Sequence, residues 1–113
     1  MASTIYYAIS LFFPEGIPGK IQFQQNDLEL FLSPNGKLTS SGMAHLRSRE
    51  LAERFLVAYL PRLQKRYRDG FEVKVSEWLS VRENKRLKAR IEKDSSLVEK
   101  RLETGVLASN MMP

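Results

Sequence analysis

The thirty residues SGMAHLRSRELAERFLVAYLPRLQKRYRDG (41–70) decide the fold, because they form the longest helix-like stretch of the chain. Their apolar residues recur at three- and four-residue spacing and predict a helix with one broad apolar face: Leu51, Ala52, Phe55, Leu56, Tyr59, Leu60 and Leu63. We expect Ser40 or Ser41 to cap its start and Gly70 to end it. Pro61 removes one helical hydrogen bond, so we expect a kink or break there, followed by the short segment RLQKRYR.

The residues before this helix predict a sheet. Ile5–Phe13 is almost continuously apolar and rich in β-branched and aromatic residues, which indicates a central strand buried on both faces. Lys20–Gln25 and Leu28–Leu32 both alternate in polarity, but the apolar residues stand at odd positions in the first run and at even positions in the second. Residues 25–27 are therefore either a tight turn or a bulge within one long strand. The sequence SPNG (33–36) predicts a turn, and Lys37–Thr39 a short edge strand.

The residues after the long helix predict one more strand and a second helix. Phe71–Val75 alternates in polarity as a half-buried strand does. Ser80 and Glu83 have the spacing of a capping box, which places the start of the second helix there. The sequence DSS (94–96) is a candidate interruption of that helix. The expected fold is α+β, with a small antiparallel sheet of about four to five strands in the order β-β-β-β-α-β-α.

Composition sets the class of the protein. Residues 1–105 are expected to form a single domain, and residues 106–113 a flexible C-terminal tail. The chain has no cysteine, which excludes disulfides, thiolate zinc sites and cysteine nucleophiles. The apolar run Thr4–Phe13 follows no Lys or Arg, precedes no small-residue cleavage site and is shorter than a membrane span. We therefore expect an intracellular, cytoplasmic protein that does not contact the membrane.

The positive charge of the chain belongs to its second half. Residues 1–61 hold five basic and five acidic residues, whereas residues 62–101 hold thirteen basic and seven acidic ones, a net charge of +6. Such an asymmetry indicates an anionic partner, usually nucleic acid. The candidate binding residues are Arg62, Lys65, Arg66, Tyr67, Arg68, Arg82, Lys85, Arg86, Arg90 and Lys93. Tyr67 either stacks on a base or closes the core.

The spacing of these basic residues predicts where a site would lie. Arg82, Arg86, Arg90 and Lys93 repeat at four, four and three residues, so on a continuous helix they line one side. We expect them to meet the RLQKRYR segment at the end of the first helix. The primary hypothesis is a small non-enzymatic nucleic-acid-binding or regulatory protein whose partner is DNA or RNA.

The alternative hypothesis is a protein-interaction module. A narrow apolar stripe on the second helix is suited to one partner helix, within the chain or in a homodimer: Leu87, Ile91, Val98 and Leu102. A sheet edge is the other candidate surface for protein binding. Small adaptors, inhibitors, assembly factors and regulators, including those of phages and plasmids, often have this composition.

Few residues are candidates for catalysis. His45 is the only histidine, and we interpret it as a solvent-facing or capping residue. Glu72-Val-Lys74 resembles the E-x-K element of one large nuclease superfamily, in which the carboxylate holds a metal and the lysine steadies the attacking water. A companion carboxylate would have to be Asp27 or Asp69. Alternating charge is also what the outer face of a strand shows, so we assign no catalytic residue, no metal and no cofactor.

Overall fold

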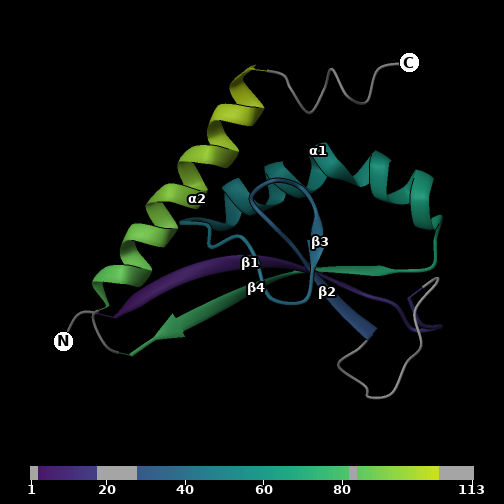
Figure 1. Ribbon diagram of the computed structural model, residues 1–113, viewed down its shortest axis with the longest axis horizontal. Coiled ribbons are helices and arrows are strands. Elements are labelled where there is room, and N and C mark those ends of the chain that lie inside the picture. Colours follow the sequence, from purple (N-terminus) through teal and green to yellow (C-terminus); the bar gives the residue numbers. More distant parts are fainter. Residues whose placement is uncertain (1–2, 18–27, 82–83, 105–113) are drawn as a thin grey trace.

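A computed structural model describes residues 3–17, 28–81 and 84–104 and confirms the α+β class. The elements follow one another as β1 (Thr4–Phe12), β2 (Glu29–Leu32), β3 (Leu38–Thr39), α1 (Arg49–Tyr67), β4 (Glu72–Ser80) and α2 (Lys85–Thr104) (Figure 1). The strands form one antiparallel sheet in the order β3-β2-β1-β4. The predicted strand 20–25, the choice between turn and bulge at 25–27, and the predicted tail 106–113 lie outside the described residues. Within the described part, neither helix is both long and apolar enough to span a membrane.

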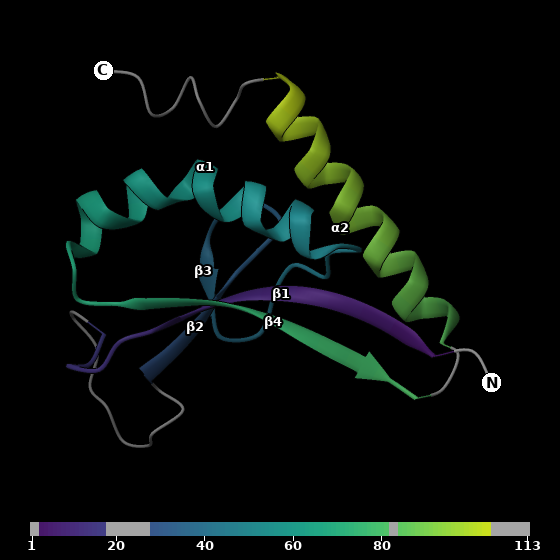
Figure 2. The same cartoon turned by 180° about the vertical axis from the view of Figure 1, so that it is seen from behind.

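β1 is the central strand, as its composition predicted, because it pairs with β2 on one side and β4 on the other. Its residues Ile9 and Leu11, with Phe13 just after it, are almost completely buried in the core against Phe55 of α1. Both helices lie on this same side of the sheet (Figures 1 and 2). The prediction that β1 is buried on both faces along its length is wrong, because Ile5 remains 45% exposed at its start.

α1 begins later than predicted. Ser48, rather than Ser40 or Ser41, caps it, and its Oγ accepts the N–H of Leu51 at 3.1 Å. The residues before it are bound to the sheet instead: the Ala44 N–H donates to Leu32 of β2 at 3.0 Å, and the N–H and C=O of Leu46 both bind Tyr7 of β1, at 2.9 and 2.7 Å. A segment whose backbone groups are already paired with a strand cannot also form a helical turn, which delays the start of the helix.

Pro61 does not break α1, which is continuous from Arg49 to Tyr67. Tyr59 and Leu63 on either side of the proline are both buried against the sheet. Their burial stabilises the helix on both sides of Pro61 and outweighs the missing hydrogen bond.

β4 is longer, and α2 starts later, than predicted. β4 pairs with β1 over its whole length, from Phe12 opposite Glu72 to Thr4 opposite Ser80. Because Ser80 belongs to the strand, it does not cap α2. Asn84 does so, since its Oδ1 accepts the N–H of Leu87 at 3.1 Å. α2 then runs without interruption through residues 94–96.

The predicted turn at residues 33–36 joins β2 to β3 and is held against α1. The Gly36 N–H donates to the Ser33 carbonyl at 2.9 Å, and Gly36 has a φ of 81°. The Tyr59 hydroxyl donates to the Asn35 carbonyl at 3.4 Å. A Cβ atom on Gly36 would lie 1.7 Å from the Tyr59 Oη, so this position requires glycine for both conformation and space.

Candidate nucleic-acid interface

The structure divides the predicted basic residues into two groups at opposite ends of the sheet. Residues 62–68 end α1, and residues 85–93 begin α2. β4 connects these ends and is nine residues long, roughly 27 Å at about 3.3 Å per residue. Figure 1 shows the end of α1 and the start of α2 on opposite sides of the molecule. The expectation that the two groups meet is therefore wrong, and Arg82 lies outside the described residues.

In the group at the end of α1, Tyr67 packs on the core and the four basic side chains are exposed. Tyr67 is half-buried, with its ring edge-on to Phe13 at a centroid distance of 5.1 Å, which supports the core interpretation of this residue. The Arg66 guanidinium lies 5.4 Å from the Tyr67 ring centroid. Arg68 ends the helix, with its N–H bound to the Gln64 carbonyl at 2.7 Å. Basic residues at a helix C-terminus are also favoured by the helix dipole, so the fold itself accounts for this group.

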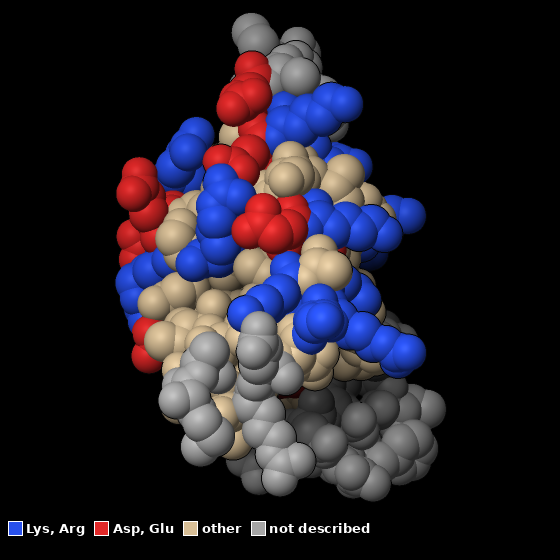
Figure 3. Space-filling model, turned by 90° about the vertical axis from the view of Figure 1, so that its left-hand side faces the viewer, with Lys and Arg blue, Asp and Glu red and all other residues tan. Residues whose placement is uncertain are grey.

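The group at the start of α2 lies at the end of its helix where cations are not favoured. Lys85, Arg86 and Lys88 follow the Asn84 cap, and the first turn holds no acidic residue. Cations at a helix N-terminus oppose the helix dipole and cost about 0.3–1 kcal/mol each. Figure 3 shows Lys and Arg side chains spread over the face of the molecule that carries α2, with fewer acidic ones among them.

Three of these residues form what we call the basic flank of α2: Arg86, Arg90 and Lys93. At about 100° per residue they fall within roughly 60° of one another around the helix axis. All three side chains are exposed. The acidic residues Glu92 and Glu99 fall about 100° or more away from Lys93, on the other side of the helix. Three of the four residues of the predicted basic row are thus aligned on α2.

The basic flank borders an open groove between α2 and the β2–β3 turn. Arg90 and Lys93 contribute one wall of the groove, and Lys37 contributes to the opposite wall. Polar groups of Asn35 and Thr39 also line it. Cations therefore stand on both sides of the groove. The sequence gives no signal for Lys37, because its proximity to α2 depends on the packing of the turn.

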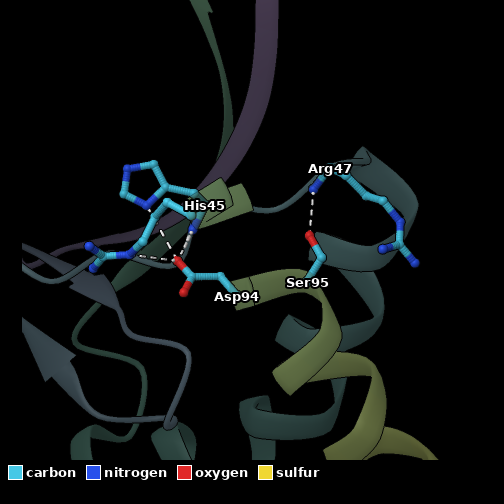
Figure 4. Close-up of polar contacts among 5 residues, drawn as sticks. His45, Arg47, Asp94 and Ser95 are labelled. Carbon is cyan, nitrogen blue, oxygen red and sulfur yellow. Dashed lines mark hydrogen bonds and ion pairs between the residues drawn. The ribbon is translucent and has the colours of Figure 1, made fainter. Parts of the chain in front are cut away.

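The position of α2 is set by two buried polar side chains, shown in Figure 4. Asp94 Oδ2 accepts the backbone N–H of His45 at 2.9 Å, and Ser95 Oγ accepts that of Arg47 at 3.1 Å. Both α2 residues are nearly inaccessible, with 2% and 0% of their surface exposed. Arg47 also forms an ion pair with Glu99 of the same helix. These contacts hold the basic flank in one place relative to the sheet.

Asp94 also bears on the groove, because its carboxylate contacts one of the cations there. The Arg90 Nε lies 3.4 Å from Asp94 Oδ2. The His45 Nδ1 is 3.4 Å from the same oxygen but is not oriented to form a hydrogen bond with it. Arg90 is thus partly neutralised by a buried anion, whereas Arg86 and Lys93 extend the positive surface to either side.

His45 is not solvent-facing, which corrects the sequence interpretation. Its side chain is 17% exposed and contacts the Tyr6 ring at a centroid distance of 4.7 Å. Tyr6 in turn lies parallel to Trp78, with centroids 6.2 Å apart. Burial raises the pKa of the Tyr6 hydroxyl. These aromatic residues lie on the face of the sheet opposite α1, a location that alternation along β1 could have indicated.

The Glu72 and Lys74 pair lies on this same face. Both side chains are exposed, opposite Phe12 and Ser10 of β1. Asp69 is exposed in the turn that precedes β4, and Asp27 lies outside the described residues. Within the described residues, no group of three or more His, Cys, Asp or Glu side chains is arranged to hold a metal ion.

The apolar stripe of α2 is engaged within the chain. Ile91 and Val98 are buried, and Leu102 packs against the core from the end of the helix. Leu87 is half-buried near the helix start. Of the two arrangements that the sequence allowed for this stripe, the structure shows packing in cis.

Comparison with known proteins yields no match: no protein-family model, curated protein or solved structure is significantly similar to this chain.

Proposed function

We propose that this protein binds nucleic acid along the basic flank of α2 and the groove beside it. The observation that carries the proposal is the one-sided placement of Arg86, Arg90 and Lys93, together with Lys37 on the facing wall of the groove. Such an arrangement fits a phosphate backbone, which binds chiefly by neutralisation of its charges. The flank spans eight residues, roughly 11 Å of helix, enough for a few phosphates.

The electrostatics of α2 support this proposal over a purely structural role for its charges. Repulsion among the cations and the unfavourable helix dipole both weaken the start of α2 when it stands alone. A bound polyanion would relieve both effects. The net charge of the whole chain, +5 at pH 7, also attracts DNA or RNA before the two molecules touch, which favours their association.

Fluorescence anisotropy with labelled duplex and single-stranded DNA and RNA of equal length tests the proposal. We expect binding at low salt, with an affinity that falls linearly with salt concentration on a double-logarithmic plot. The double variant Arg86→Glu/Lys93→Glu should bind at least about tenfold more weakly, with a salt slope reduced by about one for each residue. Arg90 is left in place because it contacts Asp94.

The matched control is Arg62→Glu/Lys65→Glu at the end of α1, which changes the net charge by the same amount on exposed residues. We expect this control to bind nearly as tightly as the wild type. If both double variants lose the same affinity, the site is not on α2. If no nucleic acid binds at low salt, the proposed function is wrong. Comparison of the four oligonucleotides identifies the preferred type.

A further inference from the structure

The two edges of the sheet differ in what covers them. Beside the start of β1, the outward N–H groups of His45 and Arg47 are bound by Asp94 and Ser95 of α2. β4 forms the opposite edge, and no described strand pairs with its outer side over nine residues. An uncovered strand of this length offers its backbone groups to another strand.

The ladder shows which groups of β4 point outward. The N–H and C=O of Tyr7 bind Leu46, so the odd-numbered residues of β1 direct their backbone groups away from β4. On β4 the odd-numbered residues lie opposite these and therefore point to the outer edge: Val73, Val75, Glu77 and Leu79. One of these groups, the Val75 carbonyl, lies 3.4 Å from Arg49 Nη1. A carbonyl oxygen has two lone pairs and can accept a second hydrogen bond.

Exposed apolar side chains concentrate at the same edge. Among the described residues, the large hydrophobic ones that are exposed are Ile5, Val57, Val73, Trp78, Leu79 and Val81. Four of these six lie in β4 or directly after it, and a fifth, Ile5, is opposite Leu79. The four expose between 38% and 68% of their surface. Apolar groups gathered along an open strand edge mark an interaction surface.

We propose that a second copy of this chain occupies the edge, with the two β4 strands antiparallel about a two-fold axis at Ser76. In this register Val73 of one copy lies opposite Leu79 of the other, and both are exposed apolar residues on the same face. Lys74 lies opposite Trp78 on the other face, where a cation can sit against the indole ring. Both contacts occur twice because the interface is two-fold symmetric.

This complementarity identifies a second copy as the occupant and sets the register. All four outward-facing residues of β4 find a backbone partner, since Val75 lies opposite Glu77. A two-residue shift to an axis at Glu77 would place the two Glu77 carboxylates directly opposite each other, which is unfavourable. The opposite shift would place Glu72 against Trp78 and lose the contact of Lys74 with that ring. The register at Ser76 avoids both.

In the resulting dimer, the four described strands of each copy join into one continuous sheet. A two-fold axis perpendicular to the sheet keeps all helices on one side and the aromatic residues Tyr6 and Trp78 of both copies on the other. α2 binds the N–H groups of His45 and Arg47 on the side of β1 remote from β4, so its basic flank stays accessible in the dimer. The inference does not depend on nucleic-acid binding and is tested separately from it.

Sedimentation velocity of the full chain, from micromolar to millimolar concentration, tests the proposal. We expect the wild type to approach twice the chain mass of 13.0 kDa. The variant Val73→Lys/Leu79→Lys places lysines opposite each other across the axis and should weaken dimerisation at least about tenfold. Val57→Lys, at an exposed position on α1, is the control and should dimerise as the wild type does. Circular dichroism verifies that each variant is folded.

A charge-swap experiment tests the register. Val73→Glu/Leu79→Glu should be monomeric alone, like the double lysine variant, but an equimolar mixture of the two should form a heterodimer because each lysine then faces a glutamate. A wild type that remains monomeric at millimolar concentration overturns the proposal and would leave the edge to an extended segment of another protein. A dimer that neither double variant weakens places the interface elsewhere. Two monomeric variants that fail to associate on mixing overturn the register at Ser76.

Discussion

Replacement of Asp94 by alanine tests how α2 is attached to the sheet. Leu46 is bonded to Tyr7, so the N–H groups of the residues on either side of it point away from β1. Asp94 Oδ2 accepts one of these, from His45, at 2.9 Å, and 2% of the Asp94 surface is exposed. In Asp94→Ala the N–H of His45 loses its partner in a region with little water.

The expected loss follows from the type of hydrogen bond. A hydrogen bond to a charged group contributes about 1.5–3 kcal/mol, and a buried donor left without a partner costs a similar amount. The contact with Arg90 adds little, because 52% of that side chain is exposed. We therefore expect Asp94→Ala to lower the free energy of unfolding by about 2–3 kcal/mol. Ser95→Ala, which removes a neutral hydrogen bond, should cost about 1–2 kcal/mol.

Urea unfolding monitored by circular dichroism measures these differences by linear extrapolation. Ser96→Ala is the matched control, since Ser96 is exposed on the same helix and alanine is the better helix former there. Hydrogen exchange of the His45 amide provides a local readout and should accelerate in Asp94→Ala more than exchange in β1 does. If Asp94→Ala lies within about 0.5 kcal/mol of the control and the His45 amide stays protected, the attachment that we describe is wrong.

Two further predictions concern other parts of the fold. Gly36→Ala should lower the free energy of unfolding by at least about 1 kcal/mol, because alanine disfavours the positive φ and its Cβ would overlap Tyr59. Urea unfolding measures the loss, and an unchanged stability would contradict the close contact. The Tyr7 hydroxyl donates to Glu77 Oε1 at 2.8 Å, and this hydrogen bond, followed by burial, raises the Tyr7 pKa above its ordinary value of 10.0. The folded state then holds the proton more tightly, so this contribution to stability is complete below pH 10 and decreases as the pH rises through the folded pKa. In Glu77→Gln, NMR titration of Tyr7 should show a lower pKa, and an unchanged titration would contradict the assignment.

Much of the fold could be predicted from the sequence, because local patterns of polarity match the elements that form. The apolar periodicity of residues 51–63, the near-continuous hydrophobicity of β1 and the turn chemistry at residues 33–36 each predicted the correct element. Helical spacing also aligned three members of the predicted basic row, Arg86, Arg90 and Lys93, whereas the fourth, Arg82, lies outside the described residues. These features depend on neighbours within a few residues, for which sequence and local structure are closely coupled.

Element boundaries depended on contacts between distant residues. β4 extends to Ser80 because β1 provides a partner for it, and α1 starts at Arg49 because Leu46, shortly before it, pairs with Tyr7. Neither pairing leaves a mark in the local sequence. Ser41 and Ser80 are residues of a type that caps helices, but neither begins one here. Strand pairing nearby satisfies more backbone groups than one cap does.

The roles of Asp94 and Ser95 illustrate the same division. In the sequence, these two polar residues interrupt the apolar stripe of the second helix, which led us to expect a break in that helix. The sequence nonetheless held a signal for their role, because at helical spacing both residues fall on the same face as Ile91 and Val98. A polar side chain buried on that face requires a hydrogen-bond partner. That the partners are backbone N–H groups of His45 and Arg47, about fifty residues earlier, follows from how the helix lies across the sheet.

The two surfaces to which we assign functions divide in the same way. The charge of α2 and its alignment on one flank were readable in the order of residues, because a helix repeats every 3.6 residues regardless of its surroundings. Tertiary packing separated that flank from the end of α1, brought Lys37 across the groove and placed β4 at an edge of the sheet that no other described strand covers. Strand order and helix placement arise from contacts between residues far apart in the chain, and no local spacing encodes them.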